Sequence, residues 1–311
     1  MLVIGAAGFI GPHVVAALER RGVEVVAAGR SGSGPHGEAL DRDDPAAVVR
    51  LVRARRIEVV IDMLALTTVG TAPLIDALEG RVGRYVLASS ADVYRNYEGL
   101  HRRAHPEPIT TPVDETSALR RSRHPYRRRP RRAKDAPDAW LDDYDKIPIE
   151  TAARERFGAG ATILRLPMIF GPKDRQRRFR WILGPMLAGG ARLRVDPAWA
   201  GWRTTYGYVD DVGDALATAA IHPEAGGRTF NVGEAEPPDH RAWIQRFAAA
   251  LGWKGEVEES PAPADSPIAG LDLRYPLILD SHAFRRTLDW REPTPPAQAL
   301  LRTAEDERAR G

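Results

Sequence analysis

The stretch VIGAAGFIG, residues 3–11, decides how this chain folds, because its three glycines stand at every third position. A strand-like apolar run precedes them and a helix-like segment follows, which is the context that gives such a motif meaning. A turn without side chains lets a pyrophosphate approach the backbone N–H groups and the positive end of the helix. An ordinary Gly-rich turn is the alternative. The residues that we expect at a dinucleotide are Gly5, Gly8, Phe9, Ile10 and Gly11.

The first half of the chain alternates short apolar runs with amphipathic segments. Such runs, nearly all apolar, are typical of parallel strands that are covered on both faces. The repeated strand–helix–strand rhythm therefore predicts a doubly wound α/β fold. From residue 254 to 298 we expect mostly loop, and residues 296–309 should form a closing helix. The candidate strands are Leu2–Ile4, Glu24–Ala28, Val59–Met63, Tyr85–Ala88, Thr162–Leu166 and the short run 228–233.

Composition excludes several classes of protein. The 311 residues are 43% apolar, yet no apolar run approaches the ~20 residues of a membrane span. The absence of cysteine excludes disulfides and thiolate chemistry, and the immediate start at a strand leaves no room for a signal peptide, so we expect a cytoplasmic protein. The eight histidines form no convincing metal set, and we expect no metal. The net charge of +3 argues against a dedicated nucleic-acid binder.

The residues after the second strand bear on which dinucleotide is used. An acid about 20 positions after the glycines would favour the 2′-hydroxyl of NAD. Here Arg30 and Ser31 stand instead, and an arginine suits a 2′-phosphate, which favours NADP over NAD. A solvated arginine is the alternative. Farther on, Asp41 and Arg42 are candidates to border the adenine, or else form an exposed acidic turn that caps the next helix.

Several further segments, in order, resemble the extended short-chain dehydrogenase/reductase family, also described as NAD-dependent epimerases/dehydratases. The resemblance spans nearly the whole chain. The segments are VIGAAGFIG (3–11), VVIDMLAL (59–66), RYVLASSADVYRNY (84–97), PVDETSALR (112–120), ILRLPMIFGP (163–172), YGYVDDV (206–212) and TFNVG (229–233).

The resemblance implies a Rossmann-type doubly wound parallel sheet with a smaller C-terminal substrate lobe. The NAD(P)-binding lobe would be residues 1–170, with a return segment at about 206–228, and the substrate lobe 171–205 and 229–311. A homodimer through the helices after residue 66 and around residue 150 is also implied. Besides the glycine turn, the implied cofactor contacts are Leu64, Ala65, Lys146 and Pro167. The catalytic Ser/Thr of the family matches Ser90.

The family pairs tyrosine with lysine as Y-x-x-x-K, and this chain departs from that spacing. In DDYDKIPIE, residues 142–150, Lys146 and Glu150 keep the K-x-x-x-E spacing, so the tyrosine position falls on Asp142. On a helix, Tyr144 would point away from Lys146. Pro148 is tolerated only in a first helical turn, however, so we expect the helix to begin near 146–148 and to leave Tyr144 outside it.

The implied chemistry needs a phenol, a serine hydroxyl on the same oxygen, and a lysine that lowers the phenol's pKa. Ser90, Lys146 and Tyr144 are our candidates, with Tyr94, Tyr126 or Asp92 as substitutes for Tyr144. Tyr144 as a packing residue is the alternative. Met168 stands where sugar-nucleotide epimerases of the family often carry asparagine, which weakens the case for such a substrate. The candidates for substrate contact are Asp92, Tyr94, Met168 and Arg203.

The run RRSRHPYRRRPRRAK, residues 120–134, carries eight arginines and one lysine. We interpret it first as a solvated insertion over the cleft, and second as a site for an anionic substrate or nucleic acid, with Tyr126 able to stack on a base. Two functions remain open. One is an NAD(P)-dependent oxidoreductase or epimerase that moves a hydride at a carbinol or carbonyl carbon of a small molecule. The other is a non-redox, regulatory or RNA-associated relative that has lost the tyrosine.

Overall fold

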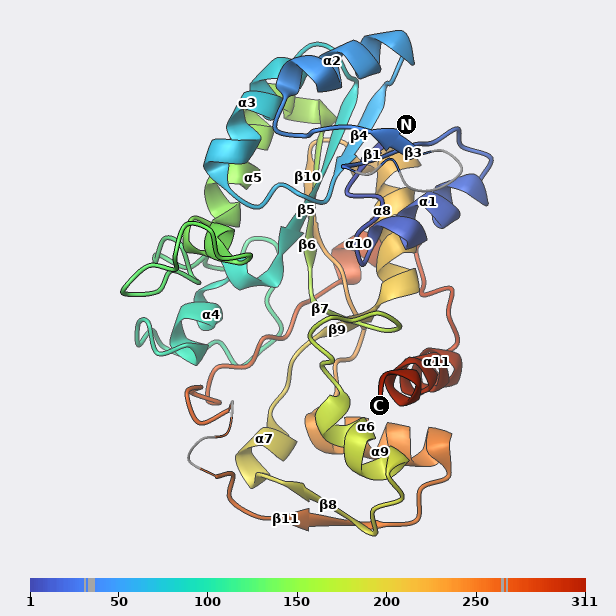
Figure 1. The fold of residues 1–311 in the computed structure, drawn as a ribbon. Helices are drawn as coiled ribbons and strands as arrows, with labels where there is room; N and C mark the ends of the chain where they lie inside the picture. Colours follow the sequence, from blue (N-terminus) through green and yellow to red (C-terminus); the bar gives the residue numbers. More distant parts are fainter. Residues whose placement is uncertain (31, 33–36, 264–265, 267) are drawn as a thin grey trace.

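The computed structural model of the chain describes residues 1–30, 32, 37–263, 266 and 268–311. Its centre is a seven-stranded sheet in the order β10-β6-β5-β4-β1-β2-β3, and every pairing in it is parallel (Figure 1). This confirms the predicted fold class. The strands are β1 (Leu2–Ile4), β2 (Val26–Gly29), β3 (Gly37–Ala39), β4 (Val59–Asp62), β5 (Arg84–Ser90), β6 (Ala161–Leu166) and β10 (Arg228–Asn231).

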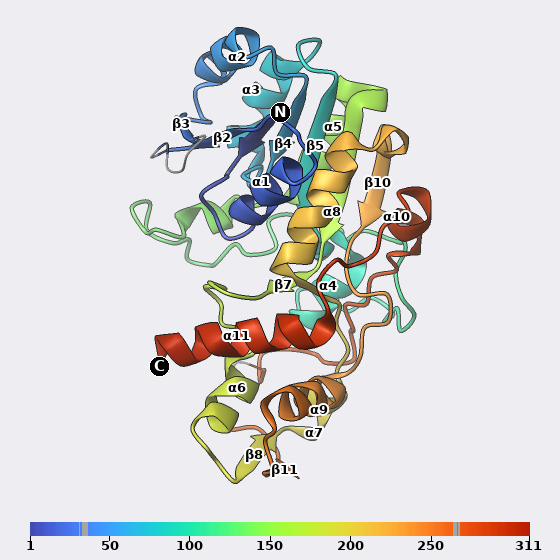
Figure 2. The same ribbon diagram turned by 90° about the vertical axis from the view of Figure 1, so that its right-hand side faces the viewer.

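Helices cover both faces of this sheet because its strands are apolar on both sides. Along β1, Leu2 and Ile4 pack into one apolar cluster and Val3 into the other, as the two-residue period of a strand requires. Figure 2 shows α1 and α8 side by side over one face of the sheet. That face is covered by α1 (Gly11–Glu19) and α8 (Val209–Ile221), and the other by α2 (Pro45–Ala54), α3 (Thr68–Leu78) and α5 (Lys146–Phe157).

A smaller part of the molecule lies beyond the carboxyl ends of the strands (Figure 1). Two short strand pairs, β7 with β9 and β8 with β11, are both parallel. Aromatic rings fill its core, where Phe179 packs between Phe170 and Trp243. Its elements are β7 (Met168–Phe170), α6 (Arg180–Leu187), β8 (Arg192–Val195), α7 (Pro197–Gly201), β9 (Tyr206–Tyr208), α9 (His240–Leu251), β11 (Glu256–Glu259) and α11 (Pro296–Arg310).

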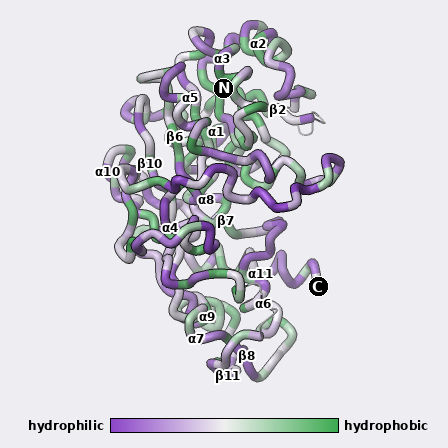
Figure 3. Tube along the Cα trace, turned by 90° about the vertical axis from the view of Figure 1, so that its left-hand side faces the viewer, coloured by the Kyte–Doolittle hydropathy of each residue, from purple (hydrophilic) through white to green (hydrophobic). Residues whose placement is uncertain are grey.

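Short helical pieces complete the chain. They are η1 (Ala91–Val93), α4 (Arg95–Leu100), η2 (Ala139–Asp142), η3 (Gly158–Gly160), η4 (Pro223–Ala225) and α10 (His282–Thr287). Strand β3 was not predicted, and β11 and α10 lie in a stretch that was expected to be loop. The closing helix was placed correctly. Hydrophobic stretches lie mainly in the sheet, with hydrophilic ones in the outer helices and loops (Figure 3). Among the described helices, none has both the length and the apolarity that crossing a membrane would take.

Close contact between α1 and α8 holds the glycine turn before α1 against the rest of the sheet. A Cβ placed on Gly213 of α8 would lie 2.6 Å from the Cβ of His13 and 2.7 Å from its carbonyl carbon. The ring of His13 also hydrogen-bonds to Asp210 at the start of α8. The two helices therefore need glycine at position 213.

We predict that Gly213→Ala lowers the free energy of unfolding by about 1–3 kcal/mol, because the two helix backbones must move apart. Gly201→Ala is the matched control, since nothing lies within 4 Å of a Cβ built there. Urea denaturation of both variants checks this. An unchanged free energy in Gly213→Ala would show that α1 and α8 adjust without cost.

Candidate active site

The glycine turn between β1 and α1 leaves room for a ligand at the backbone. Gly5 adopts a φ of +89°, and a Cβ on Gly11 would lie 2.3 Å from the carbonyl oxygen of Gly5. A side chain at either position would disturb the turn. Among the described residues, the backbone N–H groups of Phe9 and Ile10 donate no hydrogen bond. Free N–H groups in a tight turn at a helix N-terminus fit a pyrophosphate.

The residues expected near the adenosine are placed as follows. Arg30 directly follows β2 and is exposed, while Ser31 lies outside the described residues. Asp41 is exposed, and its side chain accepts from the N–H of Asp43. Arg42 is buried, and its guanidinium donates to Asp62 at 2.7 Å. The side chain of Arg42 is therefore committed to the end of β4.

Asp62 was missed in the sequence, although an acid that ends the apolar strand VVID is a visible signal. It is fully buried. Besides Arg42, its carboxylate accepts from the hydroxyl of Tyr85 at 2.7 Å and from the N–H of Leu64 at 2.9 Å. Asp62 thus fixes the course of the chain at Leu64 and Ala65, the two residues expected to pass the cofactor.

The structure answers the question raised by the spacing of Tyr144 and Lys146. Helix α5 begins at Lys146, so Pro148 lies in its first turn, as predicted. Tyr144 precedes the helix and is held in extended backbone by a bridge to Thr67. The Nζ of Lys146 lies 5.8 Å from the centre of the Tyr144 ring. The two side chains therefore meet although they are only two positions apart.

Lys146 is buried, and its position is fixed by two carbonyl oxygens. Its Nζ donates to Ala65 at 2.6 Å, after β4, and to Ala88 at 2.8 Å, in β5. Burial lowers the pKa of Lys146 to about 8. An ammonium group so held at the carboxyl ends of β4 and β5 lies where a bound dinucleotide would pass.

Tyr144 faces a buried carboxylate. Its hydroxyl donates to Oδ2 of Asp92 at 2.8 Å. Burial raises the pKa of Tyr144 well above its usual value and the charge of Asp92 raises it further, while a hydrogen bond with Ser90 acts in the opposite direction. Burial also raises the pKa of Asp92. The structure thus brings Ser90, Tyr144 and Asp92 together, and Tyr144 is held in its protonated form.

One oxygen of Asp92 is free to bind something else. Its Oδ1 is buried and has no hydrogen-bond partner among the described residues. On Oδ2, Tyr126 donates a second hydrogen bond at 3.0 Å. The Tyr126 ring packs edge-on against Tyr144, with 5.1 Å between ring centres. Tyr126, a substitute acid in the sequence analysis, is therefore part of the same cluster.

The arginine-rich run is solvated over much of its length, as first interpreted, but several of its arginines are held by the protein. The exposed basic residues are Arg121, Arg123, Arg128, Arg129, Arg131 and Lys134. The side chain of Arg120 is fully buried and that of Arg132 is only 7% exposed. Arg120 donates to Asp145 at 2.6 Å, and Arg132 pairs with Asp142. Arg127 donates to Asp143 at 2.9 Å. The carboxylates of the DDYDK segment thus hold the run over the site.

Asp142, which the spacing from Lys146 predicts for the tyrosine position of the family pattern, has a structural task. Its side chain accepts from the backbone N–H of Arg128 at 3.0 Å and of Arg132 at 2.7 Å, besides its ion pair with Arg132. It lies in η2 and is buried at 2% exposure. Asp142 therefore anchors the arginine-rich run.

The family model described as the NAD dependent epimerase/dehydratase family matches residues 1–233. The chain belongs to this family. Among curated relatives, a 2′-dehydrokanamycin reductase from Streptomyces kanamyceticus is 28% identical over 266 residues, which is 81% of this chain and 66% of the relative. A 3-diazoavenalumate denitrifying reductase from a Streptomyces species is 29% identical over 306 residues, covering 86% of this chain and 84% of the relative.

Solved structures of similar fold include enzymes that act on nucleotide sugars. A UDP-glucose 4-epimerase from Thermus thermophilus, in complex with NAD, has a TM-score of 0.68 at 23% identity, with 99% of this chain and 98% of that chain covered. A UDP-N-acetylglucosamine 4-epimerase from Bacillus cereus has a TM-score of 0.70 at 17% identity, covering 100% and 99%. At such identities these structures show the fold of this epimerase/dehydratase-family member.

Other candidates in this family member are placed outside the Tyr144 cluster. The hydroxyl of Tyr94 donates to Asn231 at 2.7 Å and accepts from Arg165 at 3.0 Å, so it is occupied. Arg203 donates to the carbonyl of Pro237 at 2.9 Å. Met168 is half-buried and packs against the apolar cluster around Trp202. Tyr94 and Arg203 thus have structural partners.

The acid of the K-x-x-x-E spacing also has a partner. Glu150 is fully buried and accepts from Ser89 at 2.6 Å and from Arg165 at 2.8 Å. Burial opposes its ionisation, but the hydrogen bonds and charge of Arg165 outweigh this and lower its pKa. Glu150 and Arg165 therefore tie α5 to β6. Among the described residues, no group of three His, Asp or Glu side chains is placed to hold a metal ion.

We predict that Asp142→Asn opens the arginine-rich run to trypsin between residues 127 and 132. The substitution removes the charge that pairs with Arg132 and weakens acceptance from the backbone N–H groups. Asp135→Asn, at an exposed position in the same segment, is the matched control. Mass spectrometry of timed digests would report the cut sites. Equal cleavage rates in the two variants would contradict the anchoring role.

Proposed function

We propose that the protein is an NADPH-dependent reductase that transfers hydride to the carbonyl carbon of a small hydroxy/keto or sugar-like substrate. The observation that carries this proposal is the hydrogen bond from Tyr144 to Asp92, which keeps the phenol protonated. A protonated phenol is suited to give a proton to a carbonyl oxygen, as reduction requires, and is poorly suited to take one from an alcohol. Both curated relatives named above are reductases.

In this proposal, side chains of the protein bind and protonate the carbonyl oxygen of the substrate. When bound, the reduced nicotinamide would supply the hydride. The hydroxyls of Ser90 and Tyr144 hold the carbonyl oxygen, and Tyr144 gives it a proton as it becomes an alkoxide. Asp92 accepts the hydrogen bond of Tyr144, and the phenolate left by the transfer takes up its next proton from solvent. Lys146 holds the cofactor ribose and is fixed by Ala65 and Ala88.

We infer a preference for NADPH from the first residue after β2. Arg30 is exposed there, at the carboxyl end of the strand that pairs with β1, and a guanidinium pairs well with a 2′-phosphate. A structural neighbour, the epimerase from Thermus thermophilus, was crystallised with NAD. A comparison of NADPH and NADH binding to this chain therefore tests the preference directly.

We further propose that residues 1–170 and 206–228 bind the cofactor, and that residues 171–205 and 229–311 bind the substrate. Two aromatic side chains of the second set, Trp202 and Tyr275, pack with Tyr97 and Tyr126 into one apolar cluster. Through Tyr126 this cluster continues to Asp92. A substrate with an apolar face and a carbonyl group fits such a wall better than a nucleotide diphosphate does.

The cofactor assignment predicts that NADPH binds and that Arg30→Ala weakens it about tenfold or more, with little effect on NADH, because a charge-assisted hydrogen bond is lost. Fluorescence titration with both cofactors measures this. Arg50→Ala, at an exposed position of α2, is the control. Binding of neither cofactor would favour the non-redox alternative, and equal losses for both would remove the argument from the 2′-phosphate.

The proton-transfer assignment predicts that Tyr144→Phe lowers kcat by about 10²–10⁴-fold on a keto-sugar whose reduction is followed by NADPH consumption. Activity should fall as pH rises through the raised pKa of Tyr144, because only the protonated phenol can give a proton. In Asp92→Asn this fall should begin at a lower pH, because the charge that raises the pKa of Tyr144 is removed. Full turnover in Tyr144→Phe would reassign the acid to another residue.

A further inference from the structure

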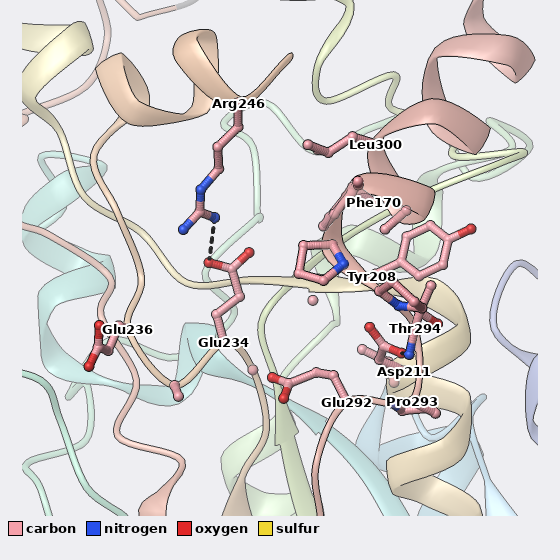
Figure 4. Close-up of a pocket in the computed structure, with 18 of the residues that line it drawn as sticks. Phe170, Tyr208, Asp211, Glu234, Glu236, Arg246, Glu292, Pro293, Thr294 and Leu300 are labelled. Atoms are coloured by element: carbon pink, nitrogen blue, oxygen red, sulfur yellow. Dashed lines mark hydrogen bonds and ion pairs between the residues drawn. The ribbon is translucent and has the colours of Figure 1, made fainter. Parts of the chain in front are cut away.

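A large cavity lies between α8, α9 and α11 and does not include the catalytic cluster. Its volume is about 940 Å³, within the ~300–1,000 Å³ range of sites that hold small organic molecules. The glycine turn, Ser90, Asp92, Tyr144 and Lys146 are not among its lining residues. Much of its wall is apolar and aromatic. Phe170, Tyr208, Pro293 and Leu300 are seen in Figure 4, and Trp243 and Trp290 also line it.

Acidic side chains from three separate segments meet in this cavity. Asp211 comes from the start of α8, Glu234 from the loop after β10, and Glu292 from the segment before α11 (Figure 4). Glu236, at the edge, is exposed. These four carboxylates face two guanidinium groups. Arg246 of α9 lies 3.6 Å from Glu234, and Arg285 of α10 pairs with Glu292.

The carboxylates are therefore short of compensating positive charge. Asp211 accepts from the N–H of Thr294 at 3.0 Å and also hydrogen-bonds with the Thr294 side chain. Burial raises the pKa of Asp211 to about 6 and that of Glu234 to about 7. The wall also contains an unused donor, because the indole N–H of Trp243 is buried and has no hydrogen-bond partner among the described residues. A buried acid with an elevated pKa would gain from a cation placed beside it.

We propose that this cavity binds a small organic cation, an amine with an apolar or aromatic body. The ammonium group pairs with Asp211, Glu234 and Glu292, and the body packs against the aromatic wall. The rings of Trp243 and Trp290 already carry the guanidinium groups of Arg246 at 5.2 Å and Arg285 at 5.0 Å, so they contribute apolar contact to the wall. The site is independent of the proposed reductase activity, so either can fail without the other.

The cavity shares a wall with the catalytic side of the molecule. Gly207 of β9 lines the cavity, and a Cβ built on it would lie 3.0 Å from Cγ of Pro167. Pro167 is the residue between β6 and β7 that was expected to contact the cofactor. Gly207 therefore separates the cavity from Pro167.

Three small probes with the same ring test the proposal by calorimetric titration without cofactor. They are phenethylamine as the cation, 2-phenylethanol as its neutral analogue and 3-phenylpropionate as an anion. We expect phenethylamine to bind most tightly and 3-phenylpropionate most weakly at pH 8. Equal affinity for the three probes, or no binding of phenethylamine, would overturn the proposal.

Two variants place the binding in this cavity. Glu234→Gln should weaken phenethylamine roughly tenfold or more, because a hydrogen bond to a charged group is lost. Glu256→Gln, an exposed acid of β11 outside the cavity, is the matched control. If Glu234→Gln does not fold, Ala250→Phe, which fills the cavity from α9, should abolish binding. Unchanged affinity in the folded cavity variant would refute the assignment.

The affinity for phenethylamine should rise from pH 5.5 to pH 8, a range that spans the pKa values of about 6 and about 7 of Asp211 and Glu234. Both lose a proton over it, while an alkyl amine with a pKa near ~10 stays charged. The charged groups that face the two acids are Arg246, Arg285, Glu292 and, on α8 itself, Asp210. The affinity for 2-phenylethanol should not follow this trend. A flat pH dependence for phenethylamine would count against the two acids as its ligands.

Discussion

The set of ion pairs between the DDYDK segment and the arginine-rich run is the constraint on which the site depends. Asp142, Asp143 and Asp145 each pair with arginines from residues 120–132. The same short segment carries Tyr144 and Lys146. Each aspartate that fixes the run therefore also fixes the backbone on which the two candidate catalytic side chains stand. Buried pairs such as Arg120 with Asp145 depend on both partners, because removing one leaves an uncompensated charge.

Tyr144 sits in an environment unlike that of a phenol paired mainly with a cation. The ammonium of Lys146 is near its ring, but the nearest charged group to its hydroxyl is the carboxylate of Asp92. An adjacent anion and burial both favour the protonated phenol, and they decide the direction in which such a group moves a proton most readily. The direction of catalysis would thus follow from a single aspartate that comes two positions after Ser90.

The fold and part of the site were predictable because they depend on local patterns. The spacing of Gly5, Gly8 and Gly11 and the alternation of apolar runs involve residues that are close together in the sequence. Such patterns can therefore be recognised before the fold is known. Pro148 restricts its own helix turn, and this placed Tyr144 outside α5 correctly. The pairing of Asp142 with Arg132 depends on how the arginine-rich run folds back onto η2. That run has almost no helix or strand periodicity, so its course could not be predicted from the sequence. The carboxylates of the cavity were equally hidden, because α8, the loop after β10 and the segment before α11 are far apart in sequence.

The anchoring role of Asp142 has a consequence for how this sequence can change over evolutionary time. Placing tyrosine at this position would not simply rebuild the family spacing, since the run at 120–134 would lose its hold. Removing the run alone would leave Asp142, Asp143 and Asp145 without their arginine partners beside α5. The two features are therefore epistatic, and a lineage that carries both is expected to keep or lose them together. A short acidic segment can in this way keep a tyrosine two positions before its lysine, because a return to the spacing of four would release the run.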